Sequence, residues 1–305
     1  MLKDRKSREL RVRLLRWYRR NGRPLPWRKT TDPYRILVSE VMLQQTQVNR
    51  VLEMYPKFLR RFPTVRTLAK ARQRDVVIAW RGMGYNNRAV RLYRLAKVVA
   101  ARHQAKIMDC YEDLVSLPGI GRYTANAILS SAFGMRAPVV DTNVRRVLSR
   151  LLWKLRSFSS VGDESLVWEA ASALLPRRSF YDWNQALMDL GATICTARAP
   201  RCTACPVVSF CSSTGSMVHD DERRIRKESS FNGIPNRIYR GRIINLLRKN
   251  NGSKPVDLVE MKREILGGRR GGVPWFRSVL RSLEKDGLVR LTQDTQGRNQ
   301  TVSLA

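Results

Sequence analysis

Histidine, acidic residues and long apolar runs are all scarce in this sequence. With His103 and His219 as its only histidines, the chain is poorly equipped for a multi-histidine metal site or a histidine-based catalytic relay. No uncharged apolar run approaches the roughly 18 residues that a membrane-spanning helix needs, and the N-terminus lacks the apolar centre of a signal peptide. We therefore expect a cytoplasmic protein that has no membrane partner.

Basic residues outnumber acidic ones by a wide margin. The 305 residues include 58 Lys+Arg and 25 Asp+Glu, which gives 58 − 25 = +33 at neutral pH. A compact body with this charge repels itself, so the excess suits a polyanionic partner, and nucleic acid is the leading example. A basic surface that serves only solubility is the alternative. Hydrophobic residues make up 43% of the chain, which excludes a disordered polycation, and the length suits about two domains.

Helical patterns dominate the chain up to about residue 212. The first 29 residues carry twelve Lys/Arg, and their apolar residues recur at helical spacing, which predicts a basic amphipathic helix that ends before Pro24. Asp32 followed by Pro33 is typical of a helix N-cap and a first helical position. Further helices are expected over residues 64–80, 86–102, 110–116, 117–133 and 144–155.

The composition changes after Cys211. Residues 213–235 are rich in Ser, Gly and charge, as is typical of a linker. Residues 236–305 then predict three helices and two short strands around a turn that contains Gly297. This pattern resembles a winged helix whose recognition helix would carry Arg277 and Arg281. A small packing domain is the alternative.

Four of the five cysteines lie within 17 residues, in the spacing C-x6-C-x2-C-x5-C. The odd total and the crowding indicate a reduced, intracellular chain with a metal site rather than a disulfide framework. Thiolates this close need a cation between them, and zinc and an iron–sulfur cluster are the two candidates. Zinc ribbons usually have two short C-x2-C pairs, whereas this sequence has one. The spacing resembles the [4Fe–4S] loop of the endonuclease III and MutY families of DNA repair glycosylases, which makes the expected ligands Cys195, Cys202, Cys205 and Cys211.

Residues 117–125, LPGIGRYTA, predict a tight turn that opens a helix. Gly119 and Gly121 permit a turn that a Cβ would obstruct. They also bare backbone N–H groups at a helix N-terminus, where the helix dipole favours an anion such as a phosphodiester. An ordinary helix corner is the alternative. The whole string resembles the helix–hairpin–helix motif of the same glycosylase superfamily.

Two carboxylates suit the cleavage of a glycosidic bond, which needs one acid to protonate the leaving base and one carboxylate to stabilise the cationic sugar. Glu40 lies in the apolar run ILVSEVML, where burial would raise its pKa and keep it protonated near neutral pH. Asp141 follows an apolar segment and precedes a helical pattern. It is either a carboxylate that faces a cleft or a helix N-cap.

The string SEVMLQQTQV at residues 39–48 is similar, almost letter for letter, to the signature of the MutY family of adenine DNA glycosylases. The likeness spans about residues 10–212 and includes LPWR at 25–28, DPY at 32–34, GMGY at 82–85 and NQALMDLGA at 184–192. It implies a mainly α, two-lobed helix–hairpin–helix DNA glycosylase with an iron–sulfur cluster loop, plus a small C-terminal winged-helix-like α+β domain. The expected parts are a cluster lobe (1–30 and 136–212), a six-helix lobe (31–135), a linker (213–235) and a terminal domain (236–305).

The resemblance also implies residue roles. Glu40 would protonate adenine, and ionised Asp141 would face the sugar cation, with Asn143 and Tyr123 in support through hydrogen bonds. Tyr123 stands where bifunctional relatives have lysine, so no Schiff base can form and water alone removes the base. The expected DNA contacts are Gln45, Thr46, the wedge Tyr85, Gly119, Gly121, Arg122, and Arg198 and Arg201 of the cysteine loop; a solvated loop face is the alternative for the last two.

The expected function is removal of adenine mispaired with guanine or 8-oxoguanine, after the base is flipped from the duplex. The expected partner is double-stranded DNA with a mismatched or damaged base pair, bound by a monomer near the nucleoid, and the expected cofactor is a [4Fe–4S] cluster. Residues 236–305 bear no evident relation to the domain by which long family members recognise 8-oxoguanine, which predicts weak discrimination for it. Two alternatives are a thymine or uracil mismatch glycosylase of the same fold, and a non-catalytic iron–sulfur winged-helix regulator.

Overall fold

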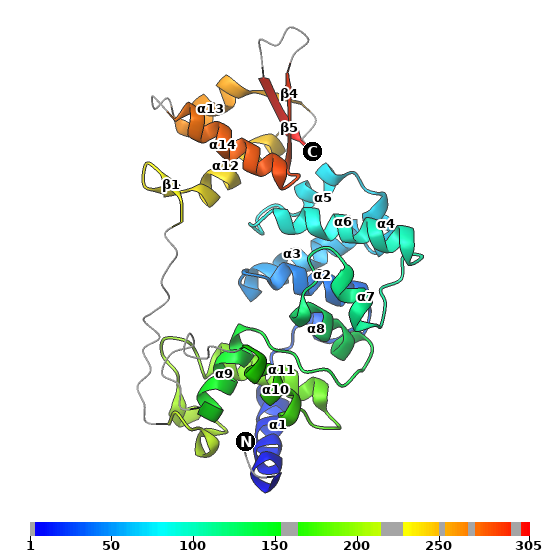
Figure 1. The fold of residues 1–305 in the computed structure, drawn as a ribbon, viewed down its shortest axis with the longest axis vertical. Helices are drawn as coiled ribbons and strands as arrows, with labels where there is room; N and C mark the ends of the chain where they lie inside the picture. Colours follow the sequence, from blue (N-terminus) through cyan, green and yellow to red (C-terminus); the bar gives the residue numbers. More distant parts are fainter. Residues whose placement is uncertain (1–3, 154–163, 215–227, 250–253, 268–271, 294–299) are drawn as a thin grey trace. The chain divides into compact units, whose positions relative to one another are not determined.

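The computed structural model describes six stretches of the chain, shown in Figure 1: residues 4–153, 164–214, 228–249, 254–267, 272–293 and 300–305. Within them the α-helix dominates, and the mainly α prediction is confirmed. The predicted turn at Gly297 and residues 215–227 of the predicted linker lie outside the described stretches. Each helix in the described stretches is too short or too polar to span a bilayer.

Two compact units make up the chain. The first comprises Met1–Leu37, Asp109–Ser116 and Ile120–Arg224, and the second comprises Val38–Met108, Leu117–Gly119 and Ile225–Ala305. The terminal domain therefore groups with the helices of residues 38–108. The four-part division expected from the sequence stays a prediction.

The described part of the first unit is helical. Its elements are α1 (Asp4–Asn21), α7 (Tyr111–Ser116), α8 (Arg122–Ala132), α9 (Thr142–Trp153), α10 (Glu164–Leu174), α11 (Phe180–Thr193) and the 3₁₀ turns η1 (Pro26–Arg28), η3 (Cys202–Ala204) and η4 (Val208–Phe210). Helices α1 and α9 both pack on α11, and their apolar sides form one core that includes Leu10, Leu14 and Trp183. The predicted basic amphipathic helix is confirmed as α1, whereas the sequence patterns did not predict α10.

Helix α2 (Pro33–Leu43) begins in the first unit and ends in the second. Asp32 caps it, because its Oδ1 accepts hydrogen bonds from the backbone N–H groups of Tyr34 (2.8 Å) and Arg35 (3.2 Å). The predicted cap, with Pro33 at the first helical position, is confirmed.

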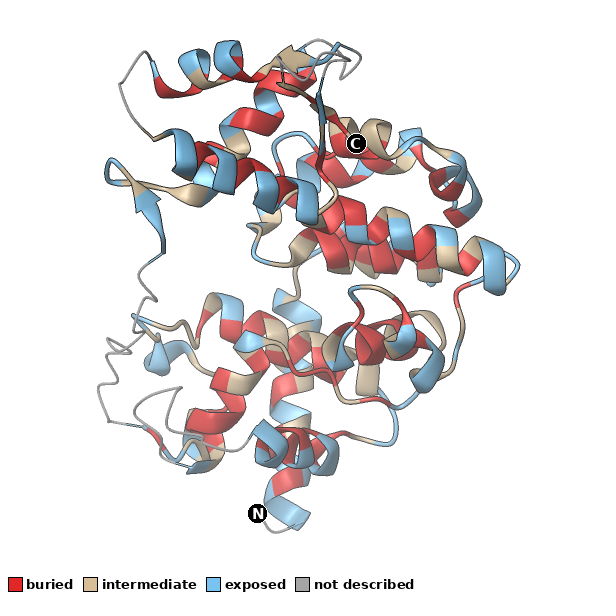
Figure 2. Cartoon of the chain, turned by 45° about the horizontal axis from the view of Figure 1, so that its top comes forward, coloured by how far each residue is buried: buried red, intermediate tan, exposed pale blue. Residues whose placement is uncertain are grey.

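Four more helices of the second unit precede the terminal domain: α3 (Val48–Arg61), α4 (Val65–Lys70), α5 (Gln73–Ala79) and α6 (Asn87–Arg102). The single helix expected over 64–80 is two helices, because the backbone of Ala71 and Arg72 is extended. Helices α4 and α5 pack on α6. Figure 2 shows the buried residues gathered along the inward sides of these helices.

The terminal domain has the chain order of a winged helix. Its elements are the hairpin β1 (Ser230–Phe231) and β2 (Ile234–Pro235), then α12 (Asn236–Lys249), β3 (Val256–Asp257), α13 (Leu258–Leu266), α14 (Val273–Lys285), β4 (Val289–Gln293) and β5 (Gln300–Leu304). The three last strands form an antiparallel sheet in the order β3-β5-β4, in which Val302 lies opposite both Val256 and Leu291. Three helices and two short strands were predicted, and the winged-helix-like fold is confirmed, with β3 as an additional strand of the sheet.

Two local predictions for this part of the chain are wrong. The end of the expected linker is the β1–β2 hairpin, closed by Asn232 (φ 50°) and Gly233 (φ 74°), and an Asn-Gly pair is the usual signal for such a turn. The helix expected from Val256 begins at Leu258, because Val256 pairs with β5 and the side chain of Asp257 caps the helix.

Candidate active site and cysteine loop

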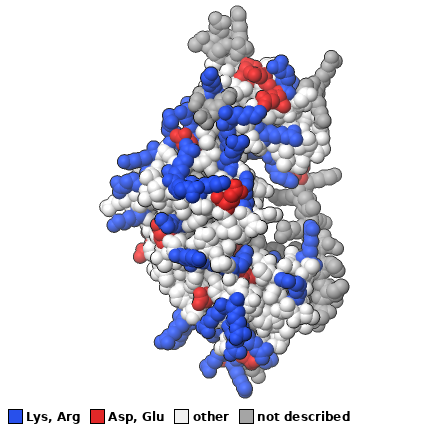
Figure 3. Space-filling view, turned by 180° about the vertical axis from the view of Figure 1, so that it is seen from behind, with Lys and Arg blue, Asp and Glu red and all other residues white. Residues whose placement is uncertain are grey.

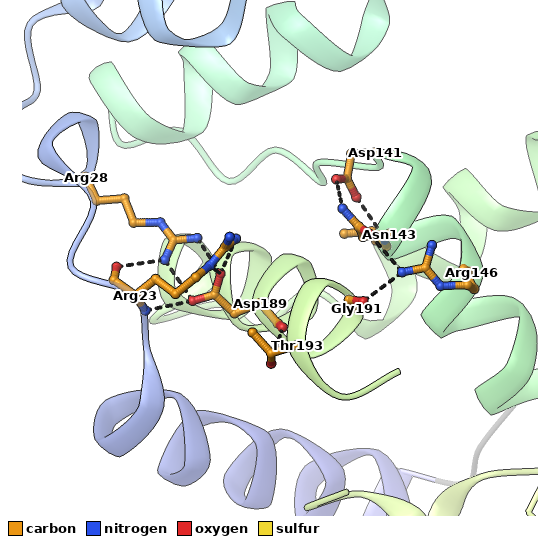
Figure 4. A network of polar contacts seen from close by, with 9 residues as sticks. Arg23, Arg28, Asp141, Asn143, Arg146, Asp189, Gly191 and Thr193 are labelled. Carbon is orange, nitrogen blue, oxygen red and sulfur yellow. Dashed lines mark hydrogen bonds and ion pairs between the residues drawn. The ribbon is translucent and has the colours of Figure 1, made fainter. Parts of the chain in front are cut away.

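Asp141 stands at the N-terminus of α9, after the segment that leads from α8. Its Oδ1 accepts a hydrogen bond from the backbone N–H of Val144 at 2.7 Å, and its Oδ2 accepts one from the side-chain amide of Asn143 at 2.8 Å (Figure 4). Asp141 is thus a helix cap, and its carboxylate has lone pairs to spare for a ligand. Burial raises the pKa of Asp141 above its usual range, and the hydrogen bonds from Val144 and Asn143 oppose this rise.

A chain of hydrogen bonds runs from Asp141 to the cysteine loop. The Oδ1 of Asn143 accepts from Nη2 of Arg146 at 2.8 Å, and the same guanidinium donates to the carbonyl oxygens of Gly191 (2.7 Å) and Cys195 (2.8 Å). A Cβ on Gly191 would lie 2.7 Å from the Cβ of Asn143, so α11 approaches α9 at a distance that only glycine allows. Sequence reasoning singled out Asn143 and gave no role to Arg146 or Gly191.

Glu40 lies on α2. Its chain neighbours Ser39 and Val41 are buried, and Glu40 itself is half-buried. Glu40 belongs to the second unit, whereas Asp141 belongs to the first. The pairing of the two carboxylates around one nucleoside stays a prediction.

A buried arginine, Arg88 on α6, joins the two loops that were expected to contact DNA. It is 4% exposed, and burial lowers its pKa to about 10. The sequence did not predict a role for Arg88. Only its position close after GMGY distinguishes it from the other Lys and Arg residues of the chain. Its guanidinium donates seven hydrogen bonds of 2.5 to 3.4 Å, to the carbonyl oxygens of Val41, Met42, Gln44, Met83, Gly84 and Tyr85 and to the hydroxyl of Thr46.

The two loops around Arg88 hold their backbone in a conformation that L-residues rarely adopt. Gln45 has φ 55° and Tyr85 has φ 40°. Tyr85 is 50% exposed, and Gln45 is exposed as well. The structure therefore joins the loop of Gln44 and Thr46 to the loop of Tyr85 through one buried guanidinium, and it leaves Gln45 and Tyr85 exposed.

The predicted hairpin precedes α8. Gly119 has φ 84°, which favours glycine, whereas Gly121 is extended and a Cβ there would meet nothing within 4 Å. Gly121 is thus not required by the turn, and it leaves open space in front of the helix N-terminus. Tyr123 is half-buried on the first turn. Arg122 lies over the ring of Trp168, with its Cζ 4.1 Å from the ring centroid, which fixes the guanidinium by a cation–π contact.

The four cysteines of the motif, Cys195, Cys202, Cys205 and Cys211, line one cavity together with Arg150 of α9. Burial raises the pKa of Cys205 to about 11, and the charges of the other three thiols act in the same direction. Arg150 Nη1 lies 3.5 Å from the sulfur of Cys195, which supplies compensating charge. A donor set of four sulfurs around one cavity fits the expected cluster, although no three His, Cys, Asp or Glu side chains in the described stretches form a site for a single ion.

Both arginines of the cysteine loop are exposed. Arg198 is exposed to solvent, and Arg201 is held to the end of α11 by its Nη2, which donates to the carbonyl of Thr193 at 2.6 Å. Basic side chains also far outnumber acidic ones on the face shown in Figure 3. The surface therefore offers many positions for contact with phosphates.

Asp189 of α11 is fully buried and binds two arginines of the N-terminal segment (Figure 4). Arg28 places Nη1 and Nη2 at 2.8 Å from the two carboxylate oxygens, and Arg23 donates through its backbone N–H at 2.9 Å and its Nε at 2.7 Å. Burial alone would raise the pKa of Asp189, but the hydrogen bonds and charge of Arg28 lower it. The ion pair of Arg28 with Asp189 joins the LPWR segment to α11, the helix that leads into the cysteine loop.

Comparisons with known proteins agree with the geometry. Residues 38–160 match the family described as HhH-GPD superfamily base excision DNA repair protein. The adenine DNA glycosylase of Mycobacterium tuberculosis is 43% identical over 239 residues, 77% of each chain, and that of Mycolicibacterium smegmatis is 38% identical over 288 residues, 93% of each chain. A solved thermostable thymine-DNA glycosylase is similar with a TM-score of 0.63 at 30% identity, over 69% of this chain and 97% of that chain. The chain belongs to the adenine DNA glycosylase family.

Proposed function

We propose that this chain excises adenine from mismatched DNA by hydrolysis of the N-glycosidic bond. The observation that carries the proposal is the likeness to an adenine DNA glycosylase along 93% of both chains, which includes the string that contains Glu40. The anchored carboxylate of Asp141 and the basic surface support it. The substrate proposed is adenine opposite guanine or 8-oxoguanine.

In the proposed mechanism Glu40 is the general acid. Its proton goes to a ring nitrogen of the flipped adenine, the C1′–N9 bond breaks, and the bonding electron pair leaves with the base. Asp141 then faces the oxocarbenium ion that remains. Burial disfavours the Asp141 anion when no substrate is bound. The positive charge on the sugar stabilises this anion, and the attraction between the two charges grows as the C1′–N9 bond breaks. Addition of water and loss of one proton give the abasic site.

Tyr123 and Asn143 would support this chemistry. Asn143 donates to Asp141 and is itself held by Arg146, so it orients the carboxylate. Tyr123 offers a phenol where an amine would be needed for an imine, so the proposed reaction leaves the DNA strand intact.

We propose that Cys195, Cys202, Cys205 and Cys211 hold a [4Fe–4S] cluster, with zinc as the alternative. When bound, the cluster would brace the loop and supply a redox-capable charge beside Arg150. The proposed DNA contacts are Gln45, Thr46 and Tyr85 at the base pair, and the hairpin (Gly119, Gly121, Arg122) and the loop arginines Arg198 and Arg201 on phosphates. A monomer that acts near the nucleoid in a reducing compartment is also proposed.

Single-turnover base release tests the proposal. The protein should free adenine from A:G and A:8-oxoguanine duplexes. Both Glu40→Gln and Asp141→Asn should lower the rate by at least about 100-fold, the lower end for general acid catalysis by Glu40 and for electrostatic stabilisation by Asp141. Because a solved thymine-DNA glycosylase shares 30% identity, a T:G duplex is the matched control. Release of thymine instead of adenine would show that thymine, and not adenine, is the base removed. Full activity of both variants would refute the catalytic roles of Glu40 and Asp141.

A further inference from the structure

The terminal domain docks on the loop that carries Tyr85. Arg248 of α12 is buried, and its Nη2 donates to the carbonyl of Val77 at 2.6 Å and to Oδ1 of Asn86, the residue after Tyr85, at 2.9 Å. Gln73 of α5 adds a hydrogen bond of 2.7 Å to the carbonyl of Gly287. Val77 also lies in the apolar core of the terminal domain. These contacts fix the domain directly beside the proposed wedge.

A groove of about 900 Å³ opens between that loop and the terminal domain. One side is the segment Met83–Asn87, and the other is formed by α12 and α14. The lining on the second side is mostly polar, and its members that can donate hydrogen bonds outward include Arg242, Asn245, Ser278 and Ser282. Arginine, serine and asparagine side chains are typical donors to DNA phosphates.

The carboxylates of the groove are already paired. Asp286 binds Arg240, and Glu228 binds Arg237. Arg242 lies over the ring of Tyr239 at 5.5 Å from its centroid, is exposed, and forms no ion pair with a carboxylate of the described stretches. The groove therefore has one uncompensated positive charge.

Gly241, in the middle of α12, also lines the groove. Glycine inside a helix costs about 0.5–1 kcal/mol relative to alanine. A Cβ at this position would meet nothing within 4 Å, so packing inside the protein does not require the glycine. The open space beside Gly241 is therefore part of the groove and is available to a ligand.

We propose that this groove binds the phosphodiester backbone of the duplex beside the base pair under repair, so the terminal domain is a second DNA-binding element next to the wedge. Arg242 is the principal phosphate contact, with the hydroxyls of Ser278 and Ser282 on the facing helix. Arg277 and Arg281 of α14 are exposed as well, although neither lines the groove. The proposal rests on the proposed function only for the choice of DNA as the ligand.

Fluorescence anisotropy with the full-length holoprotein and an A:8-oxoguanine duplex, at a series of salt concentrations, tests the groove. Arg242→Glu and Gly241→Glu should each weaken binding about tenfold, the scale of one charge-assisted hydrogen bond. Arg242→Ala should make the slope of log K against log salt less steep by about 0.9, the value for one phosphate contact. In hydroxyl-radical footprinting, the wild-type protein should protect the backbone positions that flank the mismatch, and Arg242→Glu and Gly241→Glu should no longer protect them.

Arg263→Glu is the matched control, because Arg263 is exposed on α13 of the same domain and does not line the groove. Gly241→Ala controls for the helix and should leave thermal unfolding unchanged or raise its midpoint. Wild-type affinity in both groove variants, or an equal loss in Arg263→Glu, would overturn the inference. Adenine release by the wild type is scored separately, so a protein that binds through the groove but frees no base would refute the proposed function alone.

Discussion

The buried pair of Asp189 with Arg28 gives the sharpest stability prediction. Asp189→Asn keeps the size of the side chain and removes its charge, which leaves the guanidinium of Arg28, 8% exposed, without a counter-charge. Arg23 loses its partner as well, although it is 29% exposed and water can compensate. Removal of one partner of a buried ion pair typically costs about 3–5 kcal/mol. We expect a loss near the lower end of this range, because Arg23 is partly hydrated.

Urea denaturation followed by circular dichroism measures this loss. The wild-type advantage should be present above the ordinary pKa of aspartate and should vanish as the pH falls through the lowered pKa of Asp189, because protonation there has the same effect as the substitution. Glu53→Gln is the control, since its ion pairs with Arg50 and Lys57 are at the surface and should contribute almost nothing measurable. A loss below about 1 kcal/mol for Asp189→Asn would refute the reasoning.

Three further predictions concern the candidate site. Arg88→Lys should destabilise the protein by about 4 kcal/mol, because lysine offers three donors to seven acceptors and each unmade bond costs about 1 kcal/mol; Arg91→Lys, exposed on the same helix, should be neutral in the same melt. Gly191→Ala should lower both the unfolding midpoint and the rate of adenine release, because its Cβ would press on Asn143 at 2.7 Å; an unchanged rate would show that the Asn143–Asp141 geometry tolerates the shift. In Asp141→Asn the stability relative to wild type should rise as the pH is raised from 4 to 7, because the raised pKa of Asp141 makes its ionisation a cost to the native state; a fall over that interval would contradict the burial argument.

Features with a local cause could be predicted from the sequence. The helical spacing of Leu10, Leu14 and Trp17 predicted α1, and the Asp32-Pro33 pair predicted the start of α2. The spacing of the cysteines predicted that four thiols share one site, and they line one cavity. Each depends on neighbours within a few turns of chain, where side-chain chemistry and backbone geometry are closely linked.

Features that arise from packing between distant segments could not. Arg88, Arg146 and Arg248 are buried and bind backbone carbonyls, but in a chain with 58 Lys+Arg nothing in the sequence separates them from surface arginines. The β1–β2 hairpin was not predicted for a different reason. Its Asn-Gly turn signal is present in the sequence, but the polar composition around it favoured a linker.

The positive φ of Gln45 and Tyr85 has a consequence for the way this protein reaches DNA. A left-handed backbone at a residue with a side chain costs of order 1–3 kcal/mol, and here the seven hydrogen bonds of Arg88 offset it while the chain folds. The free energy of this backbone strain is therefore offset during folding, before DNA binds, and DNA binding does not have to offset it. We expect glycine at either position to raise the free energy of unfolding and to slow the association with DNA.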